Sequence, residues 1–384
     1  SRGYYYFYKA AIEREKDEKK LRKVISDAWI YGNITAEAAE KFLAKHKKFL
    51  TTEDHVLRTE ELIWNGQTKE ADKTSKLTDN NYQMAFKAAM DIKSLGKKSE
   101  KEFHKVKGSY RYISVLLYNY LKLHTKSELN PELISLLGKI PEDSAHAKDW
   151  WKLRNYYARE LLALKKYQEA YKLASNHGLM DSSDIVEAEW IAGFISFRLL
   201  NKPEIAKDHF HKIYNLSKSS ISKARGAYWL GRSLAASGKK DEAKNWYEKG
   251  ANYGYTYYGQ LSQYELGLKN LKLPSDPGIQ KSDHKNFREN KYAEIVEFLS
   301  YSSKFEIMKL FAKEAFFTAK SDGEVDLIFQ KVKANLNTHK KTEIAKLAQQ
   351  AGVLLLDYAY PTPYKLPKNF KEKNLAYAIM RQES

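Results

Sequence analysis

Through the middle of the chain, apolar residues recur every three or four positions, which is the spacing of one face of an α-helix. The first such face after residue 184 contains Val186, Trp190, Ile191, Phe194 and Ile195. Asn201-Lys202-Pro203 predicts a turn, because proline suits the first position of a helix. The next apolar face contains Ala206, Phe210, Ile213 and Tyr214. Together the two faces predict a helical hairpin.

A second hairpin of the same kind follows. Gly238 separates its two helices, whose inward faces contain Ala224, Tyr228, Leu230, Gly231 and Leu234, then Ala243, Tyr247 and Ala251. This pattern resembles tetratricopeptide-type repeats, although its spacing is irregular. One hairpin cannot bury its apolar face alone, so we expect the hairpins to stack into an α-superhelix.

The composition favours helices along the whole chain. Tyrosine, phenylalanine and tryptophan are abundant (28, 16 and 7 residues), whereas the 384 residues include only 18 glycines and 8 prolines. Few positions are therefore suited to tight turns and hairpins of strands. We predict an all-α protein.

Two proline clusters mark boundaries, because proline interrupts helices. One contains Pro274 and Pro277, and the other contains Pro361, Pro363 and Pro367. They divide the chain into an α-superhelical domain over residues 1–272, a segment of shorter helices over 284–354 and a last segment over 355–384. Residues 274–283 read as a connector, and we expect shorter helices at 292–299, 304–318, 324–332 and 342–351.

Charge and motif content exclude several classes of function. The formal net charge is +18, but the excess is lysine spread along helical segments without an arginine-rich or glycine-aromatic motif, so a solvated surface is favoured over a nucleic-acid groove. The chain has no cysteine and no apolar run near the about 18 residues of a membrane span. We expect no cofactor, because no P-loop, Gly-x-Gly-x-x-Gly or His-Glu-x-x-His motif occurs. We expect no metal site, because His209 and His211 are two positions apart and point to different sides of a helix.

The last helix carries the candidate chemistry. Leu375, Ile379 and Glu383 are four residues apart and share one face, so the carboxylate continues an apolar stripe. Partial burial there would raise the pKa of Glu383, which suits a group that donates a proton near neutral pH. The alternative is that Glu383 is a solvated residue at a helix end.

The string AIMRQES at 378–384 resembles the first motif of the soluble lytic murein transglycosylases, and further strings support the resemblance. AEWIAGF at 188–194, SKARGAYWLGR at 222–232 and YYGQL at 257–261 are similar to the superhelical domain of that family and occur in the same order. The string that runs from Asp54-His55 to Trp64 is similar to a helix near the start of its alphaproteobacterial-type members. The aromatic residues of these strings are interpreted as helix-packing residues.

The resemblance implies a fold and an activity. The implied fold is a superhelical array of helical hairpins that can close into a ring, followed by a small helical linker domain at 284–354 and the truncated start of a lysozyme-like domain at 355–384. The implied activity is a lyase reaction on peptidoglycan, which cleaves the β-1,4 bond between MurNAc and GlcNAc without water and gives 1,6-anhydro-muramyl products. Glu383 is the implied acid and base, and Ser384 the implied substrate-binding serine, while Arg381 and Gln382 are given structural roles.

The family's Gly-Leu-Met-Gln and Ala-Tyr-Asn segments do not occur in this chain, so we expect the chain alone to be inactive. The implied partners are peptidoglycan strands and cell-wall enzymes, without nucleic acid or an integral membrane segment. The implied location is the periplasm, although no signal peptide is visible in a chain that starts at Ser1. The alternative function is a non-catalytic helical-repeat scaffold that binds protein or glycan strands.

Overall fold

The computed structural model describes residues 2–32, 34–142, 145–180, 184–275, 277–362 and 364–383, without the side chains of residues 2–5 and 36. The all-α prediction is confirmed, because these residues form helices joined by turns and no strand is found among them. The chain divides into two compact units, Ser1–Leu179 and Met180–Ser384. Each unit is described by itself.

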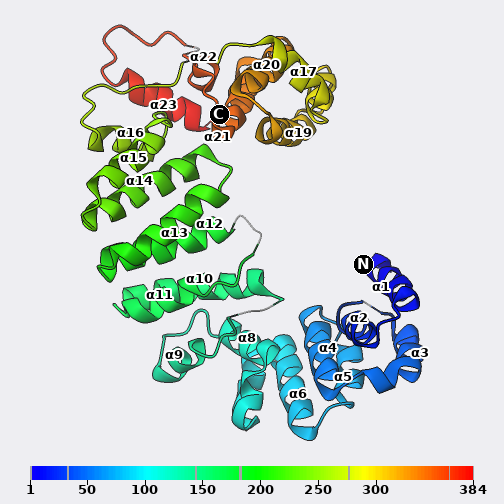
Figure 1. Cartoon of the computed structure of the whole chain (residues 1–384). Coiled ribbons are helices and arrows are strands. Elements are labelled where there is room, and N and C mark those ends of the chain that lie inside the picture. The colour runs from blue at the N-terminus through cyan, green and yellow to red at the C-terminus, as the bar shows by residue number, and fades with distance from the viewer. Residues whose placement is uncertain are drawn as a thin grey trace. The chain divides into compact units, whose positions relative to one another are not determined.

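The first unit consists of short helices that pack on their neighbours in the chain (Figure 1). They are α1 (Arg2–Arg14), α2 (Glu18–Tyr31), α3 (Ala36–His46), α4 (Thr52–Trp64), α5 (Thr68–Ser75), α6 (Asn80–Leu95), α7 (Glu100–Lys105), α8 (Ser114–Leu123), α9 (Pro131–Leu137), α10 (Ala147–Ala163) and α11 (Tyr167–Ser175).

Helix α4 contains the string from Asp54 to Trp64, and its polar residues contact α2. Thr51 caps the helix in a capping box with Asp54. Asp54 is buried and also accepts a hydrogen bond from Ser26 Oγ of α2. One turn later, Arg58 donates to the carbonyl of Trp29 and stacks over its ring, with 4.1 Å between the guanidinium carbon and the ring centroid. The string therefore joins α4 to α2.

The second unit begins with the two predicted hairpins, which the structure confirms. They comprise α12 (Asp184–Phe194) with α13 (Pro203–Leu216), and α14 (Ser220–Ala236) with α15 (Lys240–Ala251), followed by α16 (Tyr257–Glu265). Pro203 is the first residue of α13, and Gly238 has the positive φ of 81° that lets the chain turn after α14. A Cβ at Gly193 would lie 2.6 Å from the ring of Phe210, so glycine sets the close approach of α12 and α13.

The remaining helices surround a core of their own. They are α17 (Lys281–Glu289), α18 (Ala293–Ser300), α19 (Phe305–Thr318), α20 (Asp322–Val332), α21 (Thr338–Ala351), α22 (Leu356–Ala359) and α23 (Lys373–Glu383). The expected helices after residue 290 are confirmed, but α17 begins inside the expected connector because Gln280 and Asp283 form a capping box there. Tyr255, which precedes α16, packs into this core. The predicted domain boundaries near residues 272, 284 and 354 remain predictions.

Candidate functional site

The last helix, α23, carries the candidate acid Glu383 on an exposed surface. No residue of α23 is buried, and Leu375 and Ile379 are 56% and 54% exposed. Glu383 is exposed with them, so the partial burial expected from the apolar stripe is wrong for the described chain. The stripe shows that one face of α23 is apolar, but no described element covers it. Ser384, the candidate substrate-binding residue, lies outside the described residues.

Arg381 attaches this exposed helix to the rest of the unit. Its Nε donates to the carbonyl of Ala359 over 2.6 Å, and its Nη2 donates to Gln349 Oε1 over 2.7 Å. The guanidinium carbon also lies 4.2 Å from the ring centroid of Tyr360, a cation–π contact. The structural role expected for Arg381 is confirmed by these contacts, which hold α23 two residues before Glu383.

Gln349 connects three segments at this point. Its Nε2 donates to Tyr360 Oη over 3.0 Å, while its Oε1 accepts from Arg381. Its backbone carbonyl accepts a 2.6 Å hydrogen bond from Ser220 Oγ at the start of α14. The side chain and the carbonyl of one residue thus join α14, the segment after α22, and α23.

A lysine completes the attachment of α23. Lys346 Nζ of α21 donates to the carbonyl of Arg381 over 2.7 Å, which satisfies a backbone acceptor in the last turn of α23. Burial, together with the nearby charge of Arg381, lowers the pKa of Lys346. Sequence reasoning assigned no role to Gln349 or Lys346. The only available signal was that both are polar residues within an expected helix.

The aromatic residues of the strings at 188–194, 222–232 and 257–261 lie together in the second unit. The ring centroids of Trp190 and Trp229 are 5.6 Å apart, and those of Trp190 and Tyr258 are 6.3 Å apart. Arg225 lies over Trp190 at 4.6 Å. Their interpretation as helix-packing residues is confirmed, because all three rings pack against the core of the hairpins.

A buried carboxylate in the same region has both oxygens engaged. Glu189 Oε2 lies 2.5 Å from His209 Nδ1, and its Oε1 accepts from Lys212 Nζ over 3.0 Å. These contacts join α12 to α13. His209 is therefore buried in a helix contact while His211 packs against Trp246, so the two histidines diverge as expected.

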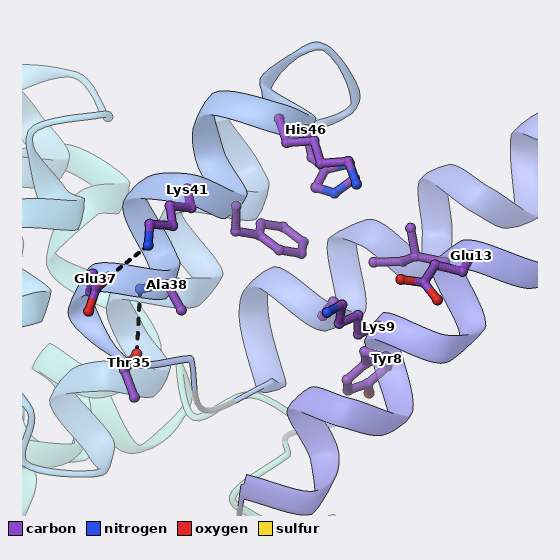
Figure 2. A pocket seen from close by; sticks show the side chains of 12 residues that line it. Tyr8, Lys9, Glu13, Thr35, Glu37, Ala38, Lys41 and His46 are labelled. Atoms are coloured by element: carbon purple, nitrogen blue, oxygen red, sulfur yellow. Dashed lines mark hydrogen bonds and ion pairs between the residues drawn. The ribbon is translucent and has the colours of Figure 1, made fainter.

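The first unit contains a cavity of about 390 Å³, beside α1 and α3 (Figure 2). Tyr8 and Phe42 provide aromatic lining, and burial lowers the pKa of His46 at its edge. Lys41 turns to Glu37, with 2.7 Å between Nζ and Oε1, instead of into the cavity. Both positive and negative side chains line the cavity, and this mixed lining selects no class of ligand.

The described residues contain no group of three His, Asp or Glu side chains placed to hold a metal ion. Within the same ranges, every helix is too short or too polar to cross a membrane. The sequence matches no protein-family model, and no curated protein matches it. The transglycosylase resemblance therefore rests on the strings quoted above.

Proposed function

We propose that this chain is part of a soluble lytic murein transglycosylase that acts on peptidoglycan in the periplasm. The observation that carries the proposal is the attachment of α23 by Arg381. Within the AIMRQES string, the arginine is tied to Ala359 and Gln349, while Glu383, two residues later, extends into solvent. Arg381 thus holds the helix two residues before the carboxylate, and a catalytic group has to be held in place by supporting residues of this kind.

The reaction needs one carboxylate in two protonation states. Protonated Glu383 gives its proton to the bridging oxygen between MurNAc and GlcNAc as the bond from that oxygen to the muramyl C1 breaks. The carboxylate then takes the proton of the muramyl 6-hydroxyl while that oxygen bonds to C1. The proton balance closes on Glu383, no water is consumed, and the product is a 1,6-anhydro ring. Ordinary glycosidases instead use two carboxylates.

Exposure of Glu383 limits what this chain does alone. A general acid is effective when neighbouring groups exclude water and hold the substrate oxygen. No described side chain encloses Glu383, which has solvent on its side of α23. We therefore expect this chain by itself to release no anhydro-muropeptides from purified sacculi, and mass spectrometric detection of such products would contradict that expectation.

The decisive test uses the coding sequence that follows Ser384. If it encodes Gly-Leu-Met-Gln within a few tens of residues, the longer protein should release 1,6-anhydro-muropeptides from sacculi, and Glu383→Gln should abolish release. Gln382→Ala is the matched control, because residue 382 is exposed on the same helix and has no proposed chemistry. A stop codon after Ser384, or full activity of Glu383→Gln, would refute the assignment.

A second candidate is a non-catalytic scaffold that binds glycan strands or protein. It is favoured by two tyrosines of α16, Tyr257 and Tyr264, which are 68% and 76% exposed and seven residues apart on one face of the helix. Co-sedimentation of the chain with insoluble peptidoglycan tests this function. Binding that is lost in the double variant Tyr257→Ala with Tyr264→Ala would support this function, and absence of binding by the wild-type chain would contradict it.

A further inference from the structure

The second unit contains a basic cavity that the proposed reaction does not use. It has a volume of about 530 Å³ and is bordered by the start of α14, the segments on either side of α16, and the end of α21. Three lysines line it, Lys218, Lys223 and Lys272, against one carboxylate, Asp322. A cavity with an excess of two positive charges attracts anions.

The three lysines are not neutralised within the protein. Other lysines of this unit do form ion pairs, as Lys309 does with Glu343 over 2.7 Å. In the described part of the chain, none of Lys218, Lys223 and Lys272 has an ion-pair partner or a hydrogen bond through Nζ. Their positive charges are therefore available to a ligand in the cavity.

The start of α14 adds backbone donors to the same wall. Ser219 is the N-cap residue of this 17-residue helix, but its side chain makes no capping bond, and the first turn contains no acidic residue. The hydroxyl of Ser217 accepts a hydrogen bond from Ser219 N over 3.1 Å, one residue before the helix begins. The free N–H groups and positive end of an uncapped helix favour an anion.

The frame of the cavity is fixed by buried hydrogen bonds. Ser220 Oγ donates to Gln349 O over 2.6 Å, which ties the start of α14 to the end of α21. Gln263 brackets the backbone of residue 272, since its Nε2 donates to Lys272 O over 2.7 Å and its Oε1 accepts from Lys272 N over 2.9 Å. The lysine side chains thus extend from a backbone that is already positioned.

We propose that this cavity binds a phosphate or pyrophosphate group. Lysine is a point charge suited to phosphate oxygens, and no arginine lines the cavity to prefer the planar carboxylate. Several oxygens spread around phosphorus can meet three ammonium groups and the first N–H groups of α14 at once. The inference does not rest on the transglycosylase proposal, because no residue of α23 lines the cavity.

The first experiment titrates pyrophosphate into the full chain by isothermal calorimetry at low ionic strength. The double variant Lys218→Gln with Lys223→Gln should weaken binding roughly tenfold or more. The control is Lys41→Gln with Lys45→Gln at the first unit's cavity, which removes the same charge and should leave affinity within about twofold. No saturable binding by the wild-type chain, or equal weakening in both double variants, would overturn the proposal.

A second variant separates binding from folding. Ser219→Asp supplies the missing cap and should raise the midpoint of thermal unfolding, because aspartate is a favoured N-cap residue. The same carboxylate occupies the anion's position and should weaken pyrophosphate binding roughly tenfold. A stabilised variant with undiminished affinity would refute the role of α14 in the site.

Vesicles then distinguish a lipid headgroup from a soluble phosphate. Vesicles of phosphatidylglycerol in phosphatidylcholine are compared with phosphatidylcholine alone. The site with a lipid source is supported if the chain sediments with the anionic vesicles, if pyrophosphate abolishes this sedimentation, and if the Lys218/Lys223 double variant does not sediment. Pyrophosphate binding without vesicle binding supports it with a soluble source. Vesicle binding that survives in the double variant, without saturable pyrophosphate binding, counts against the site.

Discussion

Arg381 and Gln349 form a 2.7 Å hydrogen bond between residues that are 32 positions apart in the sequence. The bond links α23 to α21. Gln349 also links α21 to α14, because its carbonyl accepts a hydrogen bond from Ser220 Oγ. Because α23 has no buried residue, its position depends on a few polar contacts instead of on a core.

Removing the arginine should therefore release α23 locally. We expect Arg381→Ala to raise amide hydrogen exchange in α23 by about 10- to 100-fold, since hydrogen bonds to a charged group contribute about 1.5–3 kcal/mol. Unfolding of the rest of the unit should shift little. Hydrogen exchange with mass spectrometry measures both effects, and Gln382→Ala is the control on the same helix. Equal protection of α23 in both variants would show that Arg381 does not hold it.

A double-mutant cycle tests whether the two side chains act together. Arg381→Ala, Gln349→Ala and the double variant should show a coupling free energy of about 0.5–3 kcal/mol for opening of α23, as expected for directly bonded residues. The opening free energy comes from the same exchange measurement. Additive effects would mean that Arg381 works through Ala359 and Tyr360 alone.

The hydrogen bond from Arg381 to Gln349 could not be predicted from the sequence, whereas the hairpins could. The hairpins α12/α13 and α14/α15 were predictable, because their apolar periodicity, Pro203 and Gly238 are local signals. The bond from Arg381 to Gln349 has no local signal, since a polar residue within an amphipathic helix normally faces water. Long-range polar contacts of this kind depend on how the helices are assembled.

The exposure of Glu383 was mispredicted for a related reason. The spacing of Leu375, Ile379 and Glu383 defines an apolar face correctly, but the pattern does not say what covers that face. In the described structure Leu375 and Ile379 are more than half exposed. Similarly, the string from Asp54 to Trp64 was recognisable, but the contacts of Arg58 with Trp29 depend on the packing of α2 on α4.

Glycine at the second hairpin should be needed for packing. A Cβ at Gly231 would lie 2.6 Å from Tyr247 Cε1, so Gly231→Ala forces α14 away from α15. Overpacking of this kind costs about 1–3 kcal/mol of unfolding free energy. Urea denaturation measures the loss, with Ala235→Ser on the exposed side of α14 as a control expected to stay within about 0.5 kcal/mol. An unchanged midpoint for Gly231→Ala would contradict the tight contact.

Substitutions of Arg58, the buried arginine of α4, test whether its charge or its volume contributes more to stability. Burial lowers the pKa of Arg58 to about 10, and its Nε has no hydrogen-bond partner in the described residues. Arg58→Ala should lose about 2–4 kcal/mol of stability, because it removes the contact with Trp29 and leaves a cavity.

Arg58→Met should lose less than Arg58→Ala, since methionine fills the volume without a buried charge. Chemical denaturation of both variants gives the comparison, and Lys69→Ala, at an exposed position of α5, is the control. Equal losses for methionine and alanine would indicate that the charge and its hydrogen bond to Trp29 O dominate.

Glu60 should make the stability of the first unit depend on pH. Its Oε1 accepts from Val115 N over 3.0 Å at the start of α8, and burial raises its pKa to about 7, against the opposing effect of that backbone bond. The neighbouring carboxylate of Glu61 raises the pKa further, while His146, 2.8 Å from Glu61, lowers it. Between the ordinary pKa of 4.5 and about 7, the carboxyl is ionised in the unfolded chain but still protonated in the folded protein. The free energy of unfolding therefore falls as pH rises through this range.

Glu60→Gln removes this dependence while keeping an oxygen that accepts from Val115 N. We expect the variant and the wild type to have similar unfolding free energies near pH 4, and the variant to be more stable by about 1–3 kcal/mol above pH 7. Urea denaturation at several pH values provides the measurement. The control is Glu53→Gln, exposed on the same helix, whose unfolding free energy should differ from that of the wild type by the same amount at every pH. A pH-independent difference for Glu60→Gln would mean that folding does not raise the pKa of Glu60.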